Sequence, residues 1–297
     1  MKKIWMGGII LGLWIKGVNA ESSGLTEWSV KHTVALGIVQ GITEFLPVSS
    51  TGHMLLLNGF FFKTSELPRS LKTYVVCIQL GTIVVLGWAY GREIKRIIRG
   101  IVGRDPLGFR LGMNLCLAFI PAGLCGFFWS DWIHQHLYQK EPIAWALVGG
   151  SVLIFITDRL NPRHLTQTGN DVFAVPTWTA WKIGMWQVLA LCPGLSRSLI
   201  TILAGLWLGL SLLQSVHFSF LLGCLTSSVS VGYEILSRGG EMANGGAIGP
   251  ILVGMGVAMA CGFITIRGFL WFLQTHSLKI FAYYRLILAG VIWIGTI

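Results

Sequence analysis

The chain has 297 residues, of which 54% are hydrophobic and only 11% charged, and its formal net charge is +10. Soluble domains carry roughly 25% charged residues, so this composition excludes an ordinary soluble globule, a disordered chain and a small disulfide scaffold. The 13 Trp and 6 Tyr residues and the positive charge suit the two interfaces of a membrane protein better than a nucleic-acid surface.

The first segment has the pattern of a secretory signal peptide. Two lysines precede an apolar run at 4–15, and the small residues of Val18-Asn19-Ala20 form a candidate cleavage site. The alternative is an uncleaved anchor helix, although Lys16 leaves the run shorter than the ~20 residues that span a membrane. We therefore predict a signal peptide or anchor at 1–20, followed by a single membrane domain at 28–297.

Further along the chain, six stretches are long and apolar enough to be membrane-spanning helices. Five contain no Asp, Glu, Lys or Arg, and the sixth contains only Arg285; they are about 73–90, 111–129, 143–157, 217–233, 248–266 and 280–297. The basic residues between the first two stretches, at 91–110, place this loop in the cytoplasm by the positive-inside rule. The six cysteines lie singly in apolar runs, which indicates core residues rather than disulfides or a zinc site.

Two further apolar regions are interrupted near their middle by Pro, Gly and hydroxyl residues. One is 40–57, interrupted at Pro47-Val48-Ser49-Ser50-Thr51-Gly52-His53, and the other is 187–203, interrupted at Pro193-Gly194-Leu195-Ser196-Arg197-Ser198. Broken backbone at membrane depth survives only where protein buries it or where it lines a polar cavity. We therefore predict two re-entrant hairpins, each marking a site.

The two interrupted regions also resemble each other. Gly37-Ile38-Val39-Gln40 precedes the first interruption, and Gly184-Met185-Trp186-Gln187, with the same spacing of Gly and Gln, precedes the second. Three spans separate the hairpins, and this odd number makes the second hairpin open from the opposite face. The predicted fold class is therefore all-α: a polytopic membrane protein with about six spans and an inverted repeat, the first copy at about 28–157 and the second at about 177–297.

Three ionisable residues, Glu44, His53 and Arg197, lie inside these apolar regions, where a lone charge costs at least ~2.5 kcal/mol. We expect them to face one another, either as catalytic groups or, for Glu44 and Arg197, as a structural ion pair. Arg197 follows a Pro-Gly break that can begin a helix. Helix N–H groups and a planar guanidinium together bind phosphate, so two such tips could hold a diphosphate.

The first interrupted segment, Gln40-Gly41-Ile42-Thr43-Glu44-Phe45-Leu46-Pro47-Val48-Ser49-Ser50-Thr51-Gly52-His53, closely resembles the first signature of the bacterial undecaprenyl-diphosphate phosphatases, the bacitracin-resistance family. The segment Pro193-Gly194-Leu195-Ser196-Arg197-Ser198, with Thr201, resembles the second signature, and Phe218 to Leu222 and Tyr284-Arg285 resemble further landmarks. The resemblance runs from about residue 28 to the end. It implies hydrolysis of undecaprenyl diphosphate, recycling of the carrier lipid for peptidoglycan synthesis, and bacitracin resistance.

The resemblance also assigns roles to residues. It makes Glu44 the essential acid, Ser50 and His53 the catalytic pair, and Arg197 the diphosphate clamp, while hydroxyl residues around them complete the substrate site: Ser49, Thr51, Ser196, Ser198 and Thr201. Gln40 stands where many members have Glu, so a carboxylate role rests on Glu44, with the Gln40 amide oxygen as a neutral metal ligand. The nucleophile is left open between Ser50, His53 and water.

The resemblance further implies a divalent cation, Mg²⁺ or Ca²⁺, a polyprenyl diphosphate substrate, and a multi-pass protein of the bacterial inner membrane whose site faces the periplasm. Membrane lipids are expected partners, and a homodimer is left open. The rival from another class is a lipid-phosphate transporter or flippase, because inverted repeats with broken helices also provide alternating access.

Overall fold

The computed structural model describes residues 30–62, 69–160, 171–244 and 248–295, and these residues form helices and connecting turns with no strand among them. The predicted signal peptide or anchor at 1–20 lies outside this range. The helices of the first half are α2 (Val30–Thr43), α3 (Ser50–Phe62), α4 (Arg69–Ala89), α5 (Gly91–Ile101), α6 (Pro106–Leu137) and α7 (Lys140–Leu160).

The second half repeats this order after a short 3-10 turn, η3 (Val172–Ala174). Its elements are α8 (Thr177–Gln187), the 3-10 turn η4 (Val188–Leu191), α9 (Arg197–Trp207), α10 (Leu212–Asn244), α11 (Ile248–Phe272) and α12 (Lys279–Ile294). Each half therefore has two short helices joined by a turn and then three longer helices: α4, α6 and α7 in the first half, and α10, α11 and α12 in the second. The short helix α5 between α4 and α6 has no counterpart in the second half.

Both interrupted regions are broken helices, as predicted. The break between α2 and α3 ends at Ser49, and the break before α9 ends at Ser196, whose φ angles are +70° and +71°. Each of these serines accepts, through Oγ, the backbone N–H three residues on, of Gly52 and Leu199 respectively, at 3.4 Å. Serine at the N-cap satisfies a free helix donor, so the two breaks begin their second helices in the same way.

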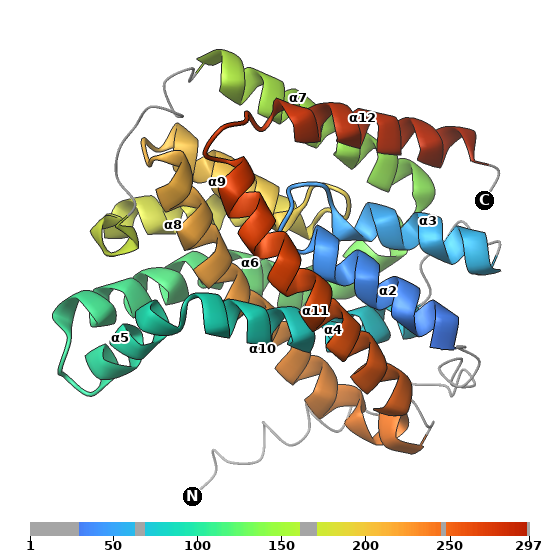
Figure 1. The fold of residues 1–297 in the computed structure, drawn as a ribbon, viewed down its shortest axis with the longest axis horizontal. Coiled ribbons are helices and arrows are strands. Elements are labelled where there is room, and N and C mark those ends of the chain that lie inside the picture. The colour runs from blue at the N-terminus through green and yellow to red at the C-terminus, as the bar shows by residue number, and fades with distance from the viewer. Residues whose placement is uncertain (1–29, 63–68, 161–170, 245–247, 296–297) are drawn as a thin grey trace, which may run out of the picture.

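Helices at equivalent positions in the two halves also pack in equivalent ways. Helix α2 packs on α11 while α8 packs on α6, and α7 lies beside α12, as Figure 1 shows. A Cβ at Gly37 would lie 2.7 Å from the carbonyl oxygen of Gly254, and a Cβ at Gly184 would lie 2.5 Å from that of Ala118. These matched glycines permit close helix packing, which is the usual basis of helix association in membranes.

Four described helices are long and apolar enough to cross a membrane: α6, α7, α11 and the Leu212–Ser237 part of α10. The expected span at 73–90 qualifies only together with α5, from which it is separated by a bend of 81°. The expected span at 280–297 forms α12, whose 16 residues are fewer than the ~20 needed for a full crossing. The protein is thus a polytopic helical membrane protein, as predicted, and its described residues contain four or five span candidates, where about six were expected.

Most of the basic segment at 91–110, expected as a loop, is helical. Isoleucines at 94, 97, 98 and 101 recur at helical spacing, and α5 packs so closely on α6 that a Cβ at Gly108 would lie 2.0 Å from the carbonyl oxygen of Arg96. The turn that follows is held by Asp105, the N-cap of α6, which accepts hydrogen bonds from the Arg96 guanidinium and the Gly108 N–H. These donors lower the pKa of Asp105 to about 2.

Candidate active site

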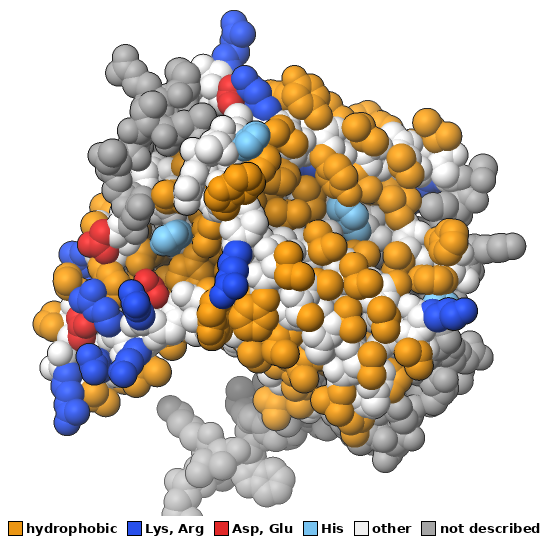
Figure 2. Space-filling view, in the orientation of Figure 1, with side chains coloured by type: hydrophobic (Ala, Val, Ile, Leu, Met, Phe, Trp, Pro, Cys, Tyr) orange, Lys and Arg blue, Asp and Glu red, His pale blue; other side chains and the backbone are white. Residues whose placement is uncertain are grey.

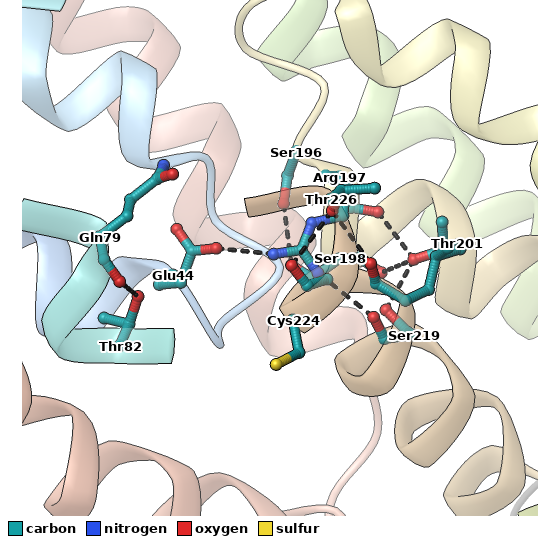
Figure 3. A network of polar contacts seen from close by, with 12 residues as sticks. Glu44, Gln79, Thr82, Ser196, Arg197, Ser198, Thr201, Ser219, Cys224 and Thr226 are labelled. Carbon is teal, nitrogen blue, oxygen red and sulfur yellow. Dashed lines mark hydrogen bonds and ion pairs between the residues drawn. The ribbon is translucent and has the colours of Figure 1, made fainter. Parts of the chain in front are cut away.

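Glu44 and Arg197 meet where the two helix breaks approach each other. Glu44 directly follows α2, Arg197 is the first residue of α9, and Glu44 Oε1 lies 2.6 Å from Arg197 Nη2 (Figure 3). Their side chains are only 8% and 20% exposed. The expectation that these two charges face each other is confirmed, and their ion pair joins the two halves of the chain.

The guanidinium of Arg197 is held in place by its neighbours, but not all of its N–H groups are hydrogen-bonded to described residues. Its Nη1 donates to the carbonyl oxygen of Ser219 on α10 at 3.2 Å, and a Cβ at Gly223 would lie 1.7 Å from the same nitrogen. Only a glycine at 223 therefore leaves room for the guanidinium. Arginine has five N–H donors, and its bonds to described residues use two of them, so three remain for an anion.

The second carboxylate oxygen of Glu44 accepts a hydrogen bond from Gln40 Nε2 at 2.8 Å. Gln40 is fully buried, and its Oε1 has no partner among the described residues. No group of three His, Cys, Asp or Glu side chains gathers anywhere in the described ranges. The residues nevertheless fit a hard cation, because Mg²⁺ commonly takes one carboxylate and completes its coordination with water and substrate phosphate.

A cavity of about 280 Å³ opens beside this ion pair and is lined mainly by hydroxyl groups. Of the predicted site residues it contains Glu44, Ser49, Ser50, Thr51, Ser196, Arg197 and Ser198. The first residues of α3 and α9 both lie in its wall, so two helix N-termini direct free N–H groups and partial positive charge to one place. This convergence is suited to a multiply charged phosphate group.

Gln40, His53 and Thr201 do not line the cavity. The Thr201 hydroxyl is bonded to the Ser219 hydroxyl at 2.6 Å and to the Arg197 carbonyl at 2.8 Å, so it fastens α9 to α10 beneath the guanidinium. Its contact with the substrate stays a prediction, and in the structure its hydroxyl helps to position Arg197.

The expected hydrogen bond between Ser50 and His53 is not formed. His53 Nδ1 lies 2.7 Å from the Ser49 carbonyl oxygen, and Nε2 lies 2.7 Å from the hydroxyl of Tyr284 on α12. Both ring nitrogens are thus engaged, one by the Ser49 carbonyl and the other by the Tyr284 hydroxyl, and neither is bonded to Ser50. Ser50 lies in the cavity wall, whereas His53 does not line the cavity.

Some cavity residues were not among those predicted. Thr226, Ser227 and Ser230 of α10 form a further part of the wall, together with Gln79 of α4 and Tyr138. A repeat offset of 147 relates Gln40 to Gln187 and Ser49 to Ser196, and the same offset relates Gln79 to Thr226. This offset was the signal in the sequence that could have paired these two polar residues on equivalent helices.

Arg285 has a role that its sequence position does not reveal. It is fully buried in α12 and donates to four carbonyl oxygens at 2.9–3.3 Å: those of Pro47, Gly194, Ala146 and Leu147. The first two belong to the two helix breaks, and the other two to α7. A Cβ at Gly150 of α7 would lie 2.1 Å from its Nη2, so the guanidinium fills a space left for it.

The fold and cavity define a class: a helical membrane protein with a polar, hydroxyl-lined cavity between two broken helices. The family model for the bacitracin resistance protein BacA matches residues 33–291, and the chain belongs to this family. Similar proteins named undecaprenyl-diphosphatase occur in Sorangium cellulosum (35% identity, 88% of this chain and 85% of the relative) and Rhodospirillum rubrum (34%, 88% and 94%). Another, in Chromobacterium violaceum, is 36% identical over 90% of this chain and 97% of its own length.

Proposed function

We propose that this protein hydrolyses undecaprenyl diphosphate to undecaprenyl phosphate and inorganic phosphate, and thereby recycles the carrier lipid for peptidoglycan synthesis and confers resistance to bacitracin. The observation that carries the proposal is the cavity beside Glu44 and Arg197, at which the N-termini of α3 and α9 converge. The relatives from Sorangium and Rhodospirillum are named undecaprenyl-diphosphatase, and that activity requires a site that recognises a diphosphate.

The first task of this site is to bind the diphosphate group of the substrate. The three remaining N–H donors of Arg197 and the N–H groups at the two helix starts hold the phosphate oxygens, and they stabilise the charge that spreads over these oxygens during transfer. Positioning and charge stabilisation therefore supply most of the rate. The apolar surface of the surrounding helices accommodates the polyprenyl tail.

Ser50 is the favoured nucleophile because it lies in the cavity wall while both His53 nitrogens are engaged elsewhere. Its Oγ bonds to the terminal phosphorus, the bridging P–O bond breaks, and undecaprenyl phosphate leaves; Glu44 accepts the hydroxyl proton. Water then attacks the phosphoserine and releases inorganic phosphate. A divalent cation held by Glu44 and the Gln40 amide oxygen would supply additional neutralisation of phosphate charge.

The proposed location is the inner membrane, with the cavity open to the periplasm. Helix α6 begins within the basic segment at 91–110 and ends at Leu137, directly before Tyr138, which lines the cavity. The cavity therefore lies toward the end of α6 that is remote from the positive charge. By the positive-inside rule this end faces outward.

Purified protein in detergent, given undecaprenyl diphosphate and Mg²⁺, tests the proposal. We expect catalytic release of inorganic phosphate, and a Glu44→Gln variant that keeps its thermal melting profile should release none. A transporter or flippase needs two compartments to show any activity, so a well-folded wild-type protein that releases no phosphate in detergent would contradict hydrolysis and favour that rival.

The nucleophile is tested by rapid quenching with substrate labelled at the terminal phosphate. Ser50 predicts label that stays on the protein in acid, whereas a phosphohistidine loses it in acid and keeps it in base. Label that is lost in acid but kept in base would overturn the serine assignment. Protein without label under either treatment would indicate direct attack by water.

A further inference from the structure

Helix α5 carries its charge on one side and its apolar residues on the other. Arg92, Lys95 and Arg99 are exposed along one face, and Ile94 and Ile97 pack against the core on the opposite face. Two further apolar side chains beside them stay uncovered: Ile98 is 58% exposed and Ile101 is 71% exposed. Basic residues above an apolar face are the pattern of a helix that lies in the membrane interface.

The direction of α5 agrees with this placement. It is bent by 81° from α4, so a membrane-spanning α4 leaves α5 close to the plane of the membrane. As the second part of a broken span, α5 would carry three basic side chains into the hydrocarbon region, where each costs at least ~2.5 kcal/mol. The interfacial position avoids that cost and still lets Ile98 and Ile101 enter the acyl boundary.

The position of α5 is fixed by contacts that leave the basic face free. Arg96 is held by Asp105, with its Nε 2.7 Å from Oδ2, and its Cζ lies 3.9 Å from the centre of the Phe173 ring. Arg92, Lys95 and Arg99, in contrast, form no ion pair with any residue in the described parts of the chain. Figure 2 shows Lys and Arg side chains gathered at the end of the molecule that α5 occupies.

We propose that α5 is a docking surface for anionic phospholipid headgroups of the leaflet on its side of the membrane, with Arg92, Lys95 and Arg99 facing the headgroups. Charge complementarity identifies this occupant: three unpaired cations lie at headgroup level beside exposed isoleucines. This surface lies at the end of α6 remote from the cavity, so lipid binding and hydrolysis are separate properties.

The test uses the full chain in nanodiscs that contain equal amounts of phosphatidylglycerol and phosphatidylcholine, with the retained lipids identified by native mass spectrometry. Wild-type protein should be enriched in phosphatidylglycerol. In the triple variant Arg92→Gln, Lys95→Gln, Arg99→Gln, the preference for phosphatidylglycerol over phosphatidylcholine should fall about tenfold or more. The reason is that each basic residue near an anionic surface contributes roughly fivefold in affinity. The double variant Arg92→Lys, Arg99→Lys keeps the charge and should retain the enrichment.

Two outcomes would overturn the proposal. Unchanged enrichment in the triple variant would assign the basic face to a different acidic partner. Equal loss in the lysine variant would indicate a specific guanidinium site rather than a charged lipid surface. Phosphate release in neutral detergent, which the proposal expects to be normal in all variants, shows that they are folded and keeps this test separate from the proposed hydrolysis.

Discussion

At the scale of single residues, the site depends on one acid, Glu44, and on two arginines with different surroundings. Arg197 pairs with Glu44 and keeps three free donors, whereas Arg285 donates only to backbone carbonyl groups. The free donors of Arg197 suit ligand binding, whereas Arg285, with four of its five donors bonded to backbone, suits construction of the site. These two roles predict different consequences for substitution.

Arg197→Lys should lose most of the turnover, by roughly a hundredfold or more, although the charge is preserved. An ammonium group cannot reproduce the planar fork that bonds Glu44, the Ser219 carbonyl and a phosphate at once. Steady-state phosphate release measures the loss. Turnover near that of the wild type would show that Arg197 acts only as a charge or a structural partner.

Gln40→Glu should retain activity, whereas Glu44→Gln should be inactive. Among the described residues, Glu44 supplies the only carboxylate that lines the cavity, whereas Gln40 does not line it and donates one hydrogen bond to Glu44. Phosphate release by both variants at saturating Mg²⁺ separates the two residues. Equal loss in both would mean that they work as one hydrogen-bonded unit.

Arg285→Met should destabilise the protein and lower turnover, because it removes a hydrogen-bond donor from four buried carbonyl oxygens, of which only that of Leu147 keeps a second side-chain donor, Ser151. Each unsatisfied group costs roughly 1–3 kcal/mol. Thermal unfolding in detergent measures this change, and Arg267→Met, which removes an exposed guanidinium on α11, is the control. Equal melting of the two variants would contradict the bridging role.

At the scale of elements, α9 and α10 together orient the clamp. Arg197 starts α9, and Gly223 of α10 provides the space for its guanidinium. Gly223→Ala should displace this group and reduce turnover as strongly as Arg197→Lys while the fold persists. Gly232→Ala in the same helix is the matched control, because a Cβ there has no atom within 4 Å and should leave turnover unchanged. Similar activity in the two variants would contradict the packing argument.

The helix breaks could be predicted from sequence because clustered Pro, Gly and hydroxyl residues interrupt a helix when they lie inside an apolar run. The pairing of Glu44 with Arg197 followed from the cost of a lone charge in such a run. The α10 wall could not be predicted in the same way, because Thr226 bonds its own helix carbonyls as ordinary hydroxyls in spanning helices do. The partners of His53 were also hidden, since Tyr284 lies 231 residues away in the chain.

At the scale of the whole molecule, two similar halves place their broken helices together in the middle of the structure, where Figure 1 shows the turns after α2 and before α9 close to one another. Ser198 Oγ donates to the Leu46 carbonyl oxygen at 3.3 Å across this junction. Each half supplies one helix start and one charged side chain, so the cavity needs both halves. The division at about 28–157 and 177–297 stays a prediction.

The most direct test of this account measures on which side of the membrane phosphate appears. Protein reconstituted in one orientation into sealed vesicles, with undecaprenyl diphosphate in the bilayer, is followed by a phosphate sensor placed first outside and then inside. The account predicts catalytic phosphate release on the side of the turn between α6 and α7, where Tyr138 lines the cavity, and none from Glu44→Gln. Release on the side of α5, or none on either side, would contradict it.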